Sequence, residues 1–225
     1  MRTYSCPACG ADVPFASSLS VSAVCPYCST LLVRHDVDVE ALGKVAALPP
    51  ETSPLQVGMQ AHDGKTAFTV LGRVRLAWGD GFWNEWFFAA EDGRRGWLAE
   101  AQGTFALSYE YTDPLHENTR RALTQLTQAK GSGGVGTALT FDGRRFVITD
   151  RKIAVCVGCE GELPIVSPTG RRTISFDFMG DPDEFVSVEA ADNGLRVFIG
   201  RYVEWADLKA SHTRPVEGWP QEAKA

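Results

Sequence analysis

GMQAHDGKTAFTVLGRVRL, residues Gly58–Leu76, is followed about 78 residues later by a similar stretch, GTALTFDGRRFVITDRKIA, residues Gly136–Ala154. The shared features are a glycine start, an Asp-Gly turn (Asp63-Gly64, Asp142-Gly143), a phenylalanine ten residues after the start (Phe68, Phe146) and an arginine (Arg73, Arg151). Two copies are too few for a solenoid, which needs at least three units to bury its faces. The repeat therefore predicts two similar units packed around a pseudo-two-fold axis.

Short runs of β-branched and aromatic residues, separated by Asp-Gly or Gly-Arg turns, predict that each unit is built of strands. These runs are Thr66–Leu71, Trp83–Ala89, Gly96–Ala99, Phe146–Ile148, Ala154–Val157 and Val186–Ala190. One helix is expected between the copies, with Asp113 as N-cap, Pro114 at the first helical position and Gly131 at its end. The expected fold is mainly β, with two β units joined by one α-helix, as open sheets, a sandwich or small barrels.

The N-terminus carries a second pattern, Cys6-Pro7-Ala8-Cys9 and Cys25-Pro26-Tyr27-Cys28, two C-x2-C pairs separated by fifteen residues. Four thiolates at this spacing complete a tetrahedral zinc shell with no open coordination position. We therefore predict a zinc ribbon in which Cys6, Cys9, Cys25 and Cys28 hold a structural metal. A rubredoxin-type iron site usually has a longer insert between its cysteine pairs and is the less favoured alternative.

Two disulfides are the other interpretation of these cysteines, and they would need an oxidising compartment. Met1–Ser5 leads directly to the first cysteine, with no apolar segment and no small-residue cleavage site, so an export signal is not indicated. The sequence has no run of about 18 apolar residues. We expect a soluble, cytoplasmic protein, and peripheral association with a membrane stays open.

The 225 residues fit a small ribbon and one larger body. The predicted organisation is a zinc ribbon over 1–35, a Pro/Ala-rich linker over 36–56, a first β repeat over 57–112, a connecting helix and Gly-rich loop over 113–135, a second β repeat over 136–210 and a disordered tail over 211–225. The prolines of the linker predict a semi-rigid tether between ribbon and body.

The charge balance argues against a broad nucleic-acid surface. The net charge is -6 and the isoelectric point is near 5.3, whereas non-specific affinity for nucleic acid comes from clustered Lys and Arg. The ribbon contributes only Arg2 and Arg34 as firm positive charges. Nucleic-acid binding through the ribbon is therefore kept only as an alternative.

Several motifs of the body resemble those of one bacterial family. They are Gly58, Phe68, Trp83–Phe88, Asp92-Gly93, Trp97–Glu100, Glu160–Pro164 and Phe198–Arg201. Together they resemble the bacterial domain of unknown function 4178, and the resemblance covers both copies. It implies an N-terminal zinc ribbon in many similar proteins and a genomic setting near polyamine-biosynthesis-like enzymes and small membrane proteins. It implies no catalytic residues.

Repeated carboxylates give the best case for enzyme chemistry. If Glu85 is aligned with Glu162, and Glu100 with Asp177, a pseudo-two-fold axis could bring acids together in one cleft. A hydrolase-like enzyme using them is therefore an alternative. Repeated arginines accompany the acids, so structural Arg-carboxylate bonds are the favoured interpretation. Cys156 and Cys159 are interpreted as buried, inert thiols, since further metal ligands would have to come from distant parts of the chain.

Six aromatic residues crowd the segment Trp78–Phe88. Because consecutive residues of a strand point to opposite faces, Trp86, Phe87 and Phe88 are expected to be buried on both sides, between the repeats; a partly exposed patch is the alternative. The favoured function is a non-enzymatic binding or adaptor protein for a protein partner or small ligand. The binding residues we select are Trp83, Glu85, Trp86 and Glu162.

Overall fold

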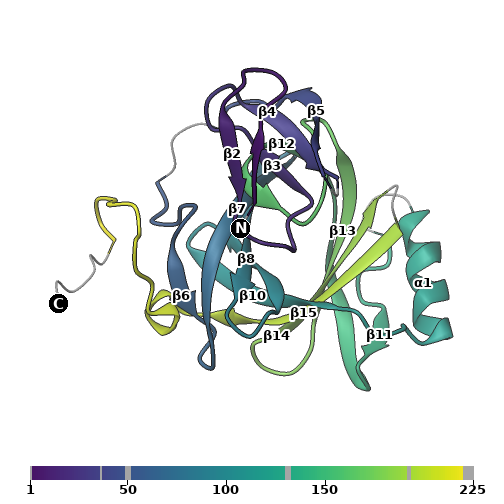
Figure 1. The fold of residues 1–225 in the computed structure, drawn as a ribbon. Coiled ribbons are helices and arrows are strands. Elements are labelled where there is room, and N and C mark those ends of the chain that lie inside the picture. The colour runs from purple at the N-terminus through teal and green to yellow at the C-terminus, as the bar shows by residue number, and fades with distance from the viewer. Residues whose placement is uncertain (1, 36, 49–51, 130–132, 192–193, 220–225) are drawn as a thin grey trace.

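The computed structural model describes residues 2–35, 37–48, 52–129, 133–191 and 194–219 (Figure 1). Fifteen strands, one α-helix and one 3₁₀ turn make up its regular structure, so the expected mainly β fold is confirmed. No helix of the described residues is long and apolar enough to cross a bilayer.

The N-terminal module consists of two small antiparallel sheets. Its strands are β1 (Arg2–Ser5), β2 (Asp12–Phe15), β3 (Ser22–Val24), β4 (Thr30–Arg34) and β5 (Val39–Lys44). Strands β1 and β2 form one hairpin, and β3, β4 and β5 form the other sheet. Their shared core is small and includes Tyr4, Phe15 and Leu32 together with two of the cysteines. A core of this size needs an additional source of stability.

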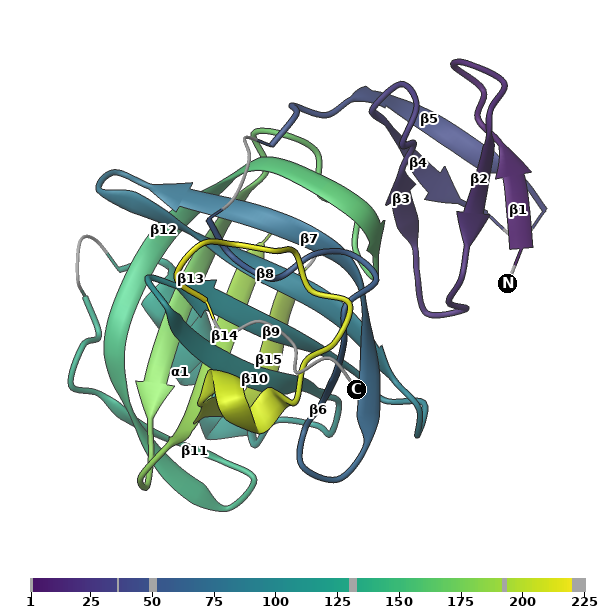
Figure 2. The ribbon, with the colours of Figure 1, turned by 90° about the vertical axis from the view of Figure 1, so that its left-hand side faces the viewer.

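Eight antiparallel strands of the body close into a barrel (Figure 2). They are β7 (Ala67–Trp78), β8 (Gly81–Ala90), β9 (Arg95–Ala101), β10 (Thr104–Tyr111), β12 (Arg144–Leu163), β13 (Arg172–Met179), β14 (Glu184–Ala191) and β15 (Gly194–Val203). Each repeat contributes a four-stranded meander. The meanders join where β10 pairs with β15 and where β7 pairs with β12, so the two copies form one body.

The opening segments of the two repeats have the same backbone contacts at an offset of 78 residues. In the first, Gly58 N–H donates to the carbonyl of Val70, and Val70 N–H donates to that of Met59. Gly136, Ile148 and Thr137 repeat both bonds. Short strands β6 (Gln60–His62) and β11 (Ala138–Phe141) pair with β7 and β12, which both carry a bulge just after these bonds.

From the second strand of each meander onward, the offset between equivalent residues becomes 90. The cross-strand partners Trp86, Leu98 and Leu107 of the first repeat correspond to Phe176, Val188 and Val197 of the second. The additional 12 residues lie in the end of β12 beyond Cys156, the equivalent of Trp78, and in the longer connection to β13. The alignment of Glu85 with Glu162 is therefore wrong, and so is that of Glu100 with Asp177. The register instead aligns Glu85 with Ser175 and Asp177 with Phe87.

Both joins of the barrel are symmetric. Tyr109 on β10 pairs with Ile199 on β15, its own equivalent at the offset of 90. Ala77 on β7 likewise pairs with Val155 on β12, its equivalent at the offset of 78. A pseudo-two-fold axis therefore passes through both joins, and two similar meanders are sufficient to close the sheet without leaving an unpaired edge between them.

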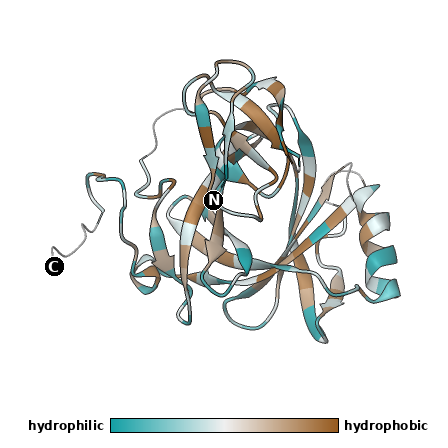
Figure 3. Ribbon diagram, in the orientation of Figure 1, coloured by the Kyte–Doolittle hydropathy of each residue, from teal (hydrophilic) through white to brown (hydrophobic). Residues whose placement is uncertain are grey.

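Additional elements cover the outside of each repeat. Helix α1 (Glu117–Thr127) and β11 cover the second repeat, where Leu123 and Phe141 join its buried core; the outward face of the helix is hydrophilic (Figure 3). The helix begins later than expected because His116 is its N-cap, accepting from Asn118 N–H, while Leu115 packs against the core. The expected C-terminal Gly131 lies outside the described residues.

The first repeat is covered by the segment before β6 and by the C-terminal chain. Leu55 and Met59 are buried there beside the 3₁₀ turn Trp205–Leu208. The tail that was expected to be disordered is partly ordered: Ser211 bridges to Gln60, and Trp219 packs with its ring centroid 5.5 Å from that of Trp205. Residues 220–225 lie outside the described residues.

The ribbon and the barrel share a backbone ladder. Ala23 and Ser22 of β3 pair with Glu162 and Leu163 at the end of β12, and Val21 N–H donates to the Leu163 carbonyl at 2.8 Å. The segment expected to be a tether contains strand β5, and Pro49 and Pro50 lie outside the described residues. The ribbon is therefore attached by strand pairing as well as by the connecting chain.

The three consecutive aromatics of β8 are buried as predicted, but Trp86 and Phe88 do not lie between the repeats. Trp86 and Phe88 pack in the core outside the barrel, with Leu55 and Met59. Phe87 points to the other side, where its ring centroid lies 5.4 Å from that of Trp97. The strand is buried on both sides because the covering segments bury Trp86 and Phe88 and the barrel core buries Phe87.

Candidate functional site

The four N-terminal cysteines converge on one point. Their sulfur atoms all lie within 4.8 Å of one another, and the Cys6–Cys28 and Cys9–Cys25 sulfur pairs are each 3.7 Å apart. Tetrahedral coordination with metal–sulfur bonds of about 2.3 Å places the sulfurs about 3.8 Å apart. The cluster could therefore hold a tetrahedral metal ion. In the described residues it is the one group of three or more potential ligands that lie this close together.

Two similar backbone turns position the cysteines. In each, the N–H of the fourth residue after the first cysteine donates to that cysteine's carbonyl: Gly10 to Cys6 and Ser29 to Cys25. Gly10 and Ser29 both have positive φ, 77° and 59°. The left-handed residue closes the turn, so that both thiols of a pair point to the same side. Two such pairs supply four ligands, which leaves no coordination position for a substrate.

Glu162 fastens the ribbon to the barrel. Its carboxylate accepts hydrogen bonds from Ala16 N–H at 2.6 Å, Ser17 N–H at 3.2 Å and the Ser20 hydroxyl at 2.6 Å. The residue is only 8% exposed. Its acceptor capacity is therefore used at this contact, and it lies away from the barrel interior.

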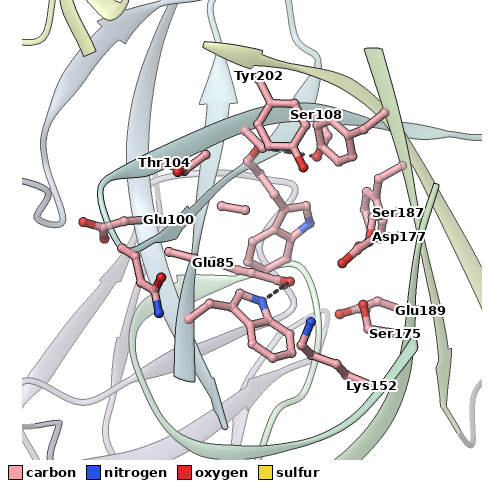
Figure 4. A pocket seen from close by; sticks show the side chains of 18 of the residues that line it. Glu85, Glu100, Thr104, Ser108, Lys152, Ser175, Asp177, Ser187, Glu189 and Tyr202 are labelled. Carbon is pink, nitrogen blue, oxygen red and sulfur yellow. Dashed lines mark hydrogen bonds between the residues drawn. The ribbon is translucent and has the colours of Figure 1, made fainter. Parts of the chain in front are cut away.

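The barrel lumen contains a cavity of about 400 Å³, within the range of small-molecule sites (Figure 4). Aromatic residues form part of its wall: Trp78, Trp83, Trp97, Phe185, Phe198 and Tyr202. Glu85, Lys152, Asp177 and Glu189 contribute charge, and Ser108, Ser175 and Ser187 contribute hydroxyl groups. An apolar wall with a few convergent polar groups is typical of a ligand pocket.

The cavity exists because the two repeats fill equivalent positions differently. Phe87, Trp97 and Ala99 of the first repeat correspond to Asp177, Ser187 and Glu189 of the second. Phe87 and Trp97 belong to a packed apolar core, and Trp97 and Ala99 also line the cavity, as do all three members of the second set. Smaller polar side chains at two of these positions leave room that the rings occupy in the other repeat.

The lumen carboxylates influence one another. The barrel wall removes Glu85 from bulk water, and this burial together with the neighbouring Glu189 charge raises the pKa of Glu85 to about 8. The indole N–H of Trp83 donates to Glu85 at 3.0 Å and opposes that shift. Burial also raises the pKa of Asp177, although the nearby Lys152 acts in the opposite direction. Groups of neighbouring carboxyls with shifted pKa values are typical of functional sites.

The structure brings together two of the four binding residues selected from the sequence. Trp83 and Glu85 line the lumen. Trp86 lies in the outer core, where its indole N–H donates to Glu100 at 3.0 Å and Arg73 stacks on its ring. The fourth, Glu162, is the ribbon contact. A hydrolase site formed by Glu85 and Glu162 is therefore not assembled.

Sequence reasoning did not select Asp177, Ser187 and Glu189 as binding residues. Ser187 and Glu189 alternate with buried valines along a run that was correctly predicted as a strand. Polar residues at every second position of a strand expected to be covered on both faces are the signal that could have indicated a polar lumen.

Cys156 and Cys159 are both buried, and Cys159 donates to the Ser167 carbonyl at 3.4 Å. Burial raises the pKa of both thiols, that of Cys159 to about 12. Since the thiolate is the reactive form, neither is suited to nucleophilic chemistry at neutral pH. The interpretation as inert core thiols agrees with these features.

Residues 58–205 match the model of a family described as a domain of unknown function, DUF4178. The match covers both repeats and the whole barrel, and the chain belongs to this family. No curated protein and no solved structure matches the chain.

Proposed function

We propose that this protein binds a small ligand inside the barrel and that its ribbon is stabilised by zinc. The observation that carries the ligand proposal is the lumen cavity, which opens where Ser187 stands in place of a tryptophan. Aromatic walls offer apolar contact, and the carboxylates, which are buried or half-buried, offer orientation. The described lining residues include no histidine or cysteine, so binding is favoured over catalysis.

Zinc is the metal that best suits the cysteine cluster, because four thiolates in a closed tetrahedral set are typical of structural zinc. Cys6, Cys9, Cys25 and Cys28 would hold it, and it would stabilise the small core of the ribbon. Metal analysis of the purified protein should give one zinc per chain. A protein that is fully folded and metal-free after chelation would contradict this role.

A protein partner is the second form of the binding proposal, and the ribbon is its natural location. Tyr27, between the cysteines of the second turn, is 74% exposed. Exposed aromatic side chains are common anchors at interfaces. The cytoplasmic location and the polyamine- or membrane-associated setting expected from the sequence remain part of this proposal. Affinity capture with the Cys25→Ser variant as control tests whether a partner depends on the ribbon.

The ligand proposal is tested by purifying the protein from its own cells under native conditions and identifying the small molecules released on denaturation. Ser187→Trp, which copies the equivalent Trp97, should fill the lumen and abolish retention. Ser108→Phe, which copies Phe198, is a second filling variant should the first fail to fold. Equal small-molecule content in wild type and a folded filling variant would contradict a luminal site.

A further inference from the structure

The side chain of Glu189 is buried and faces the lumen. The residue is 6% exposed and lines the cavity (Figure 4). In the described part of the chain its ion-pair contact is with Arg196, whose Nη1 is 3.9 Å away, beyond hydrogen-bond distance. A buried carboxylate is costly unless a donor or a cation satisfies it. Among the described residues no hydrogen bond to this carboxylate is found, so it can accept one from a donor that a ligand supplies.

The two cations beside the lumen acids, Lys152 and Arg196, also pair with other carboxylates. Lys152 forms an ion pair with Asp150 on its own strand. Arg196 bonds to Glu110 at 3.2 Å. Each of these cations is thus shared with a second carboxylate, and the acids Glu85, Asp177 and Glu189 outnumber the one cation, Lys152, among the described lining residues. This excess of acids disfavours an anionic ligand and favours a positively charged one.

The arrangement of the acids distinguishes an organic cation from a metal ion. In the residues that the structure describes, the cysteines are the one set of ligand atoms that converge closely enough for a metal. The four carboxylates that line the cavity, Glu85, Glu100, Asp177 and Glu189, come from four different strands, β8, β9, β13 and β14, and do not meet this condition. A larger cation, bearing several N–H donors, can reach separated acceptors that a metal ion cannot.

The aromatic wall supplies a second set of contacts for a cationic ligand. The ammonium of Lys152 already lies 5.1 Å from the ring centroid of Trp78, so the wall is compatible with a cation beside an indole. Trp83, Trp97 and Tyr202 extend this surface around the cavity. Aromatic faces attract ammonium groups and also pack against an apolar body.

We propose that the luminal ligand is an organic ammonium compound whose charged nitrogen is bound by Glu189 and Glu85 and whose apolar body packs against the lumen tryptophans. The inference rests on the proposed ligand-binding function of the same cavity.

Proton coupling follows from the same arrangement. The groups acting on Glu85 are Glu189 on β14, Asp177 on β13, Arg196 on β15 and the Trp83 indole on its own strand. With its pKa raised to about 8, Glu85 is largely protonated at neutral pH, and an ammonium ligand would favour the charged form. Binding should release a proton and strengthen as the pH rises from about 6 to about 8.

Three matched probes test the ligand class: benzylammonium, benzyl alcohol and benzoate. Each is titrated into the full-length protein while the indole N–H resonance of Trp83, bonded to Glu85, is followed by NMR. Benzylammonium should shift this resonance and bind about tenfold or more tightly than benzyl alcohol, which lacks the charge. Benzoate should not bind.

Glu189→Gln should weaken benzylammonium binding by about tenfold or more and leave benzyl alcohol unaffected. Glu85→Gln is a second test that also removes the pH dependence. Glu184→Gln is the matched control, since this acid lies on the same strand but pairs with Arg144 at the surface, and its affinity should equal that of wild type.

Benzyl alcohol or benzoate binding as tightly as benzylammonium would overturn the cation inference while leaving the lumen a ligand site. Binding of benzylammonium that Glu189→Gln does not weaken would also overturn it. Failure of all three probes refutes the inference, and the native co-purification then decides separately whether the lumen holds any ligand.

Discussion

Replacing Glu162 by alanine should loosen the ribbon from the barrel. The substitution removes the acceptor for Ala16 N–H, Ser17 N–H and the Ser20 hydroxyl. A hydrogen bond to a charged group contributes about 1.5–3 kcal/mol, and two of these three are short. Water can reach part of the contact and the β3–β12 pairing remains, so we expect the free energy of local opening to fall by roughly 3 kcal/mol rather than by the full sum.

Hydrogen exchange measures this opening directly, because two of the donors are backbone amides. A loss of roughly 3 kcal/mol should speed exchange of the Ala16 and Ser17 amides on the order of 100-fold. Glu184→Ala removes a half-exposed acid paired with Arg144 and should change stability by less than about 1 kcal/mol. Unchanged exchange at Ala16 and Ser17 in the Glu162→Ala protein would refute the assigned role.

Three further substitutions test other parts of the structure. Cys25→Ser should abolish metal binding and the hydrogen-exchange protection of residues 2–35, because the metal supplies much of the stability of the small ribbon core. The tryptophan fluorescence of the barrel should stay native. Unfolding of the barrel together with the ribbon would contradict this, since the two would then form one cooperative unit. Glu85→Gln should raise the melting temperature increasingly as pH rises from about 4.5 to about 8, since the native pKa of Glu85 lies above its ordinary value and its ionisation destabilises the fold over that interval; a difference that does not vary with pH contradicts this. Gly72→Ala would place its Cβ 2.1 Å from a carbonyl oxygen of β12, so the free energy of unfolding measured in urea should fall by about 3 kcal/mol. Gly79→Ala, with open space around its Cβ, should leave that free energy nearly unchanged. Equal effects of the two substitutions would contradict the close approach of β7 and β12.

Local patterns were sufficient for the cysteine cluster and for the first part of each repeat. The spacing of Cys6, Cys9, Cys25 and Cys28 allows little other geometry when each pair lies in a tight turn. The glycines Gly58 and Gly136 have similar positive φ values, 91° and 87°, so the backbone requirement they share was visible as an identity in the sequence.

The remainder depends on long-range pairing, which no local pattern reveals. Closure of the barrel requires β7 to pair with β12 and β10 to pair with β15. The alignment of the two repeats by sequence was wrong after the first strand, because the connection between β12 and β13 is longer than the one between β7 and β8. The wrong alignment paired Glu85, which faces the lumen, with Glu162, which binds the ribbon. Asp177 was placed opposite Glu100 for the same reason, and its role in the lumen was missed.

The repeat also explains how a binding cavity can arise in a barrel of this size. A closed barrel of eight strands has an interior that side chains can fill or that can hold one small ligand. Here Phe87 and Trp97 fill one part, whereas Asp177 and Ser187 leave the equivalent part open. Divergence at a few inward positions therefore separates a packing role from a binding role within one duplicated sheet.

Crystals grown with 4-bromobenzylammonium would test the central claim most directly, because the anomalous signal of bromine locates the ligand without assumptions about its pose. The account predicts a bromine peak inside the lumen, near Trp78, Trp83 and Tyr202, with the ammonium directed to Glu189. Bromine sites confined to the outer surface, with the lumen unchanged at a saturating concentration, would contradict it.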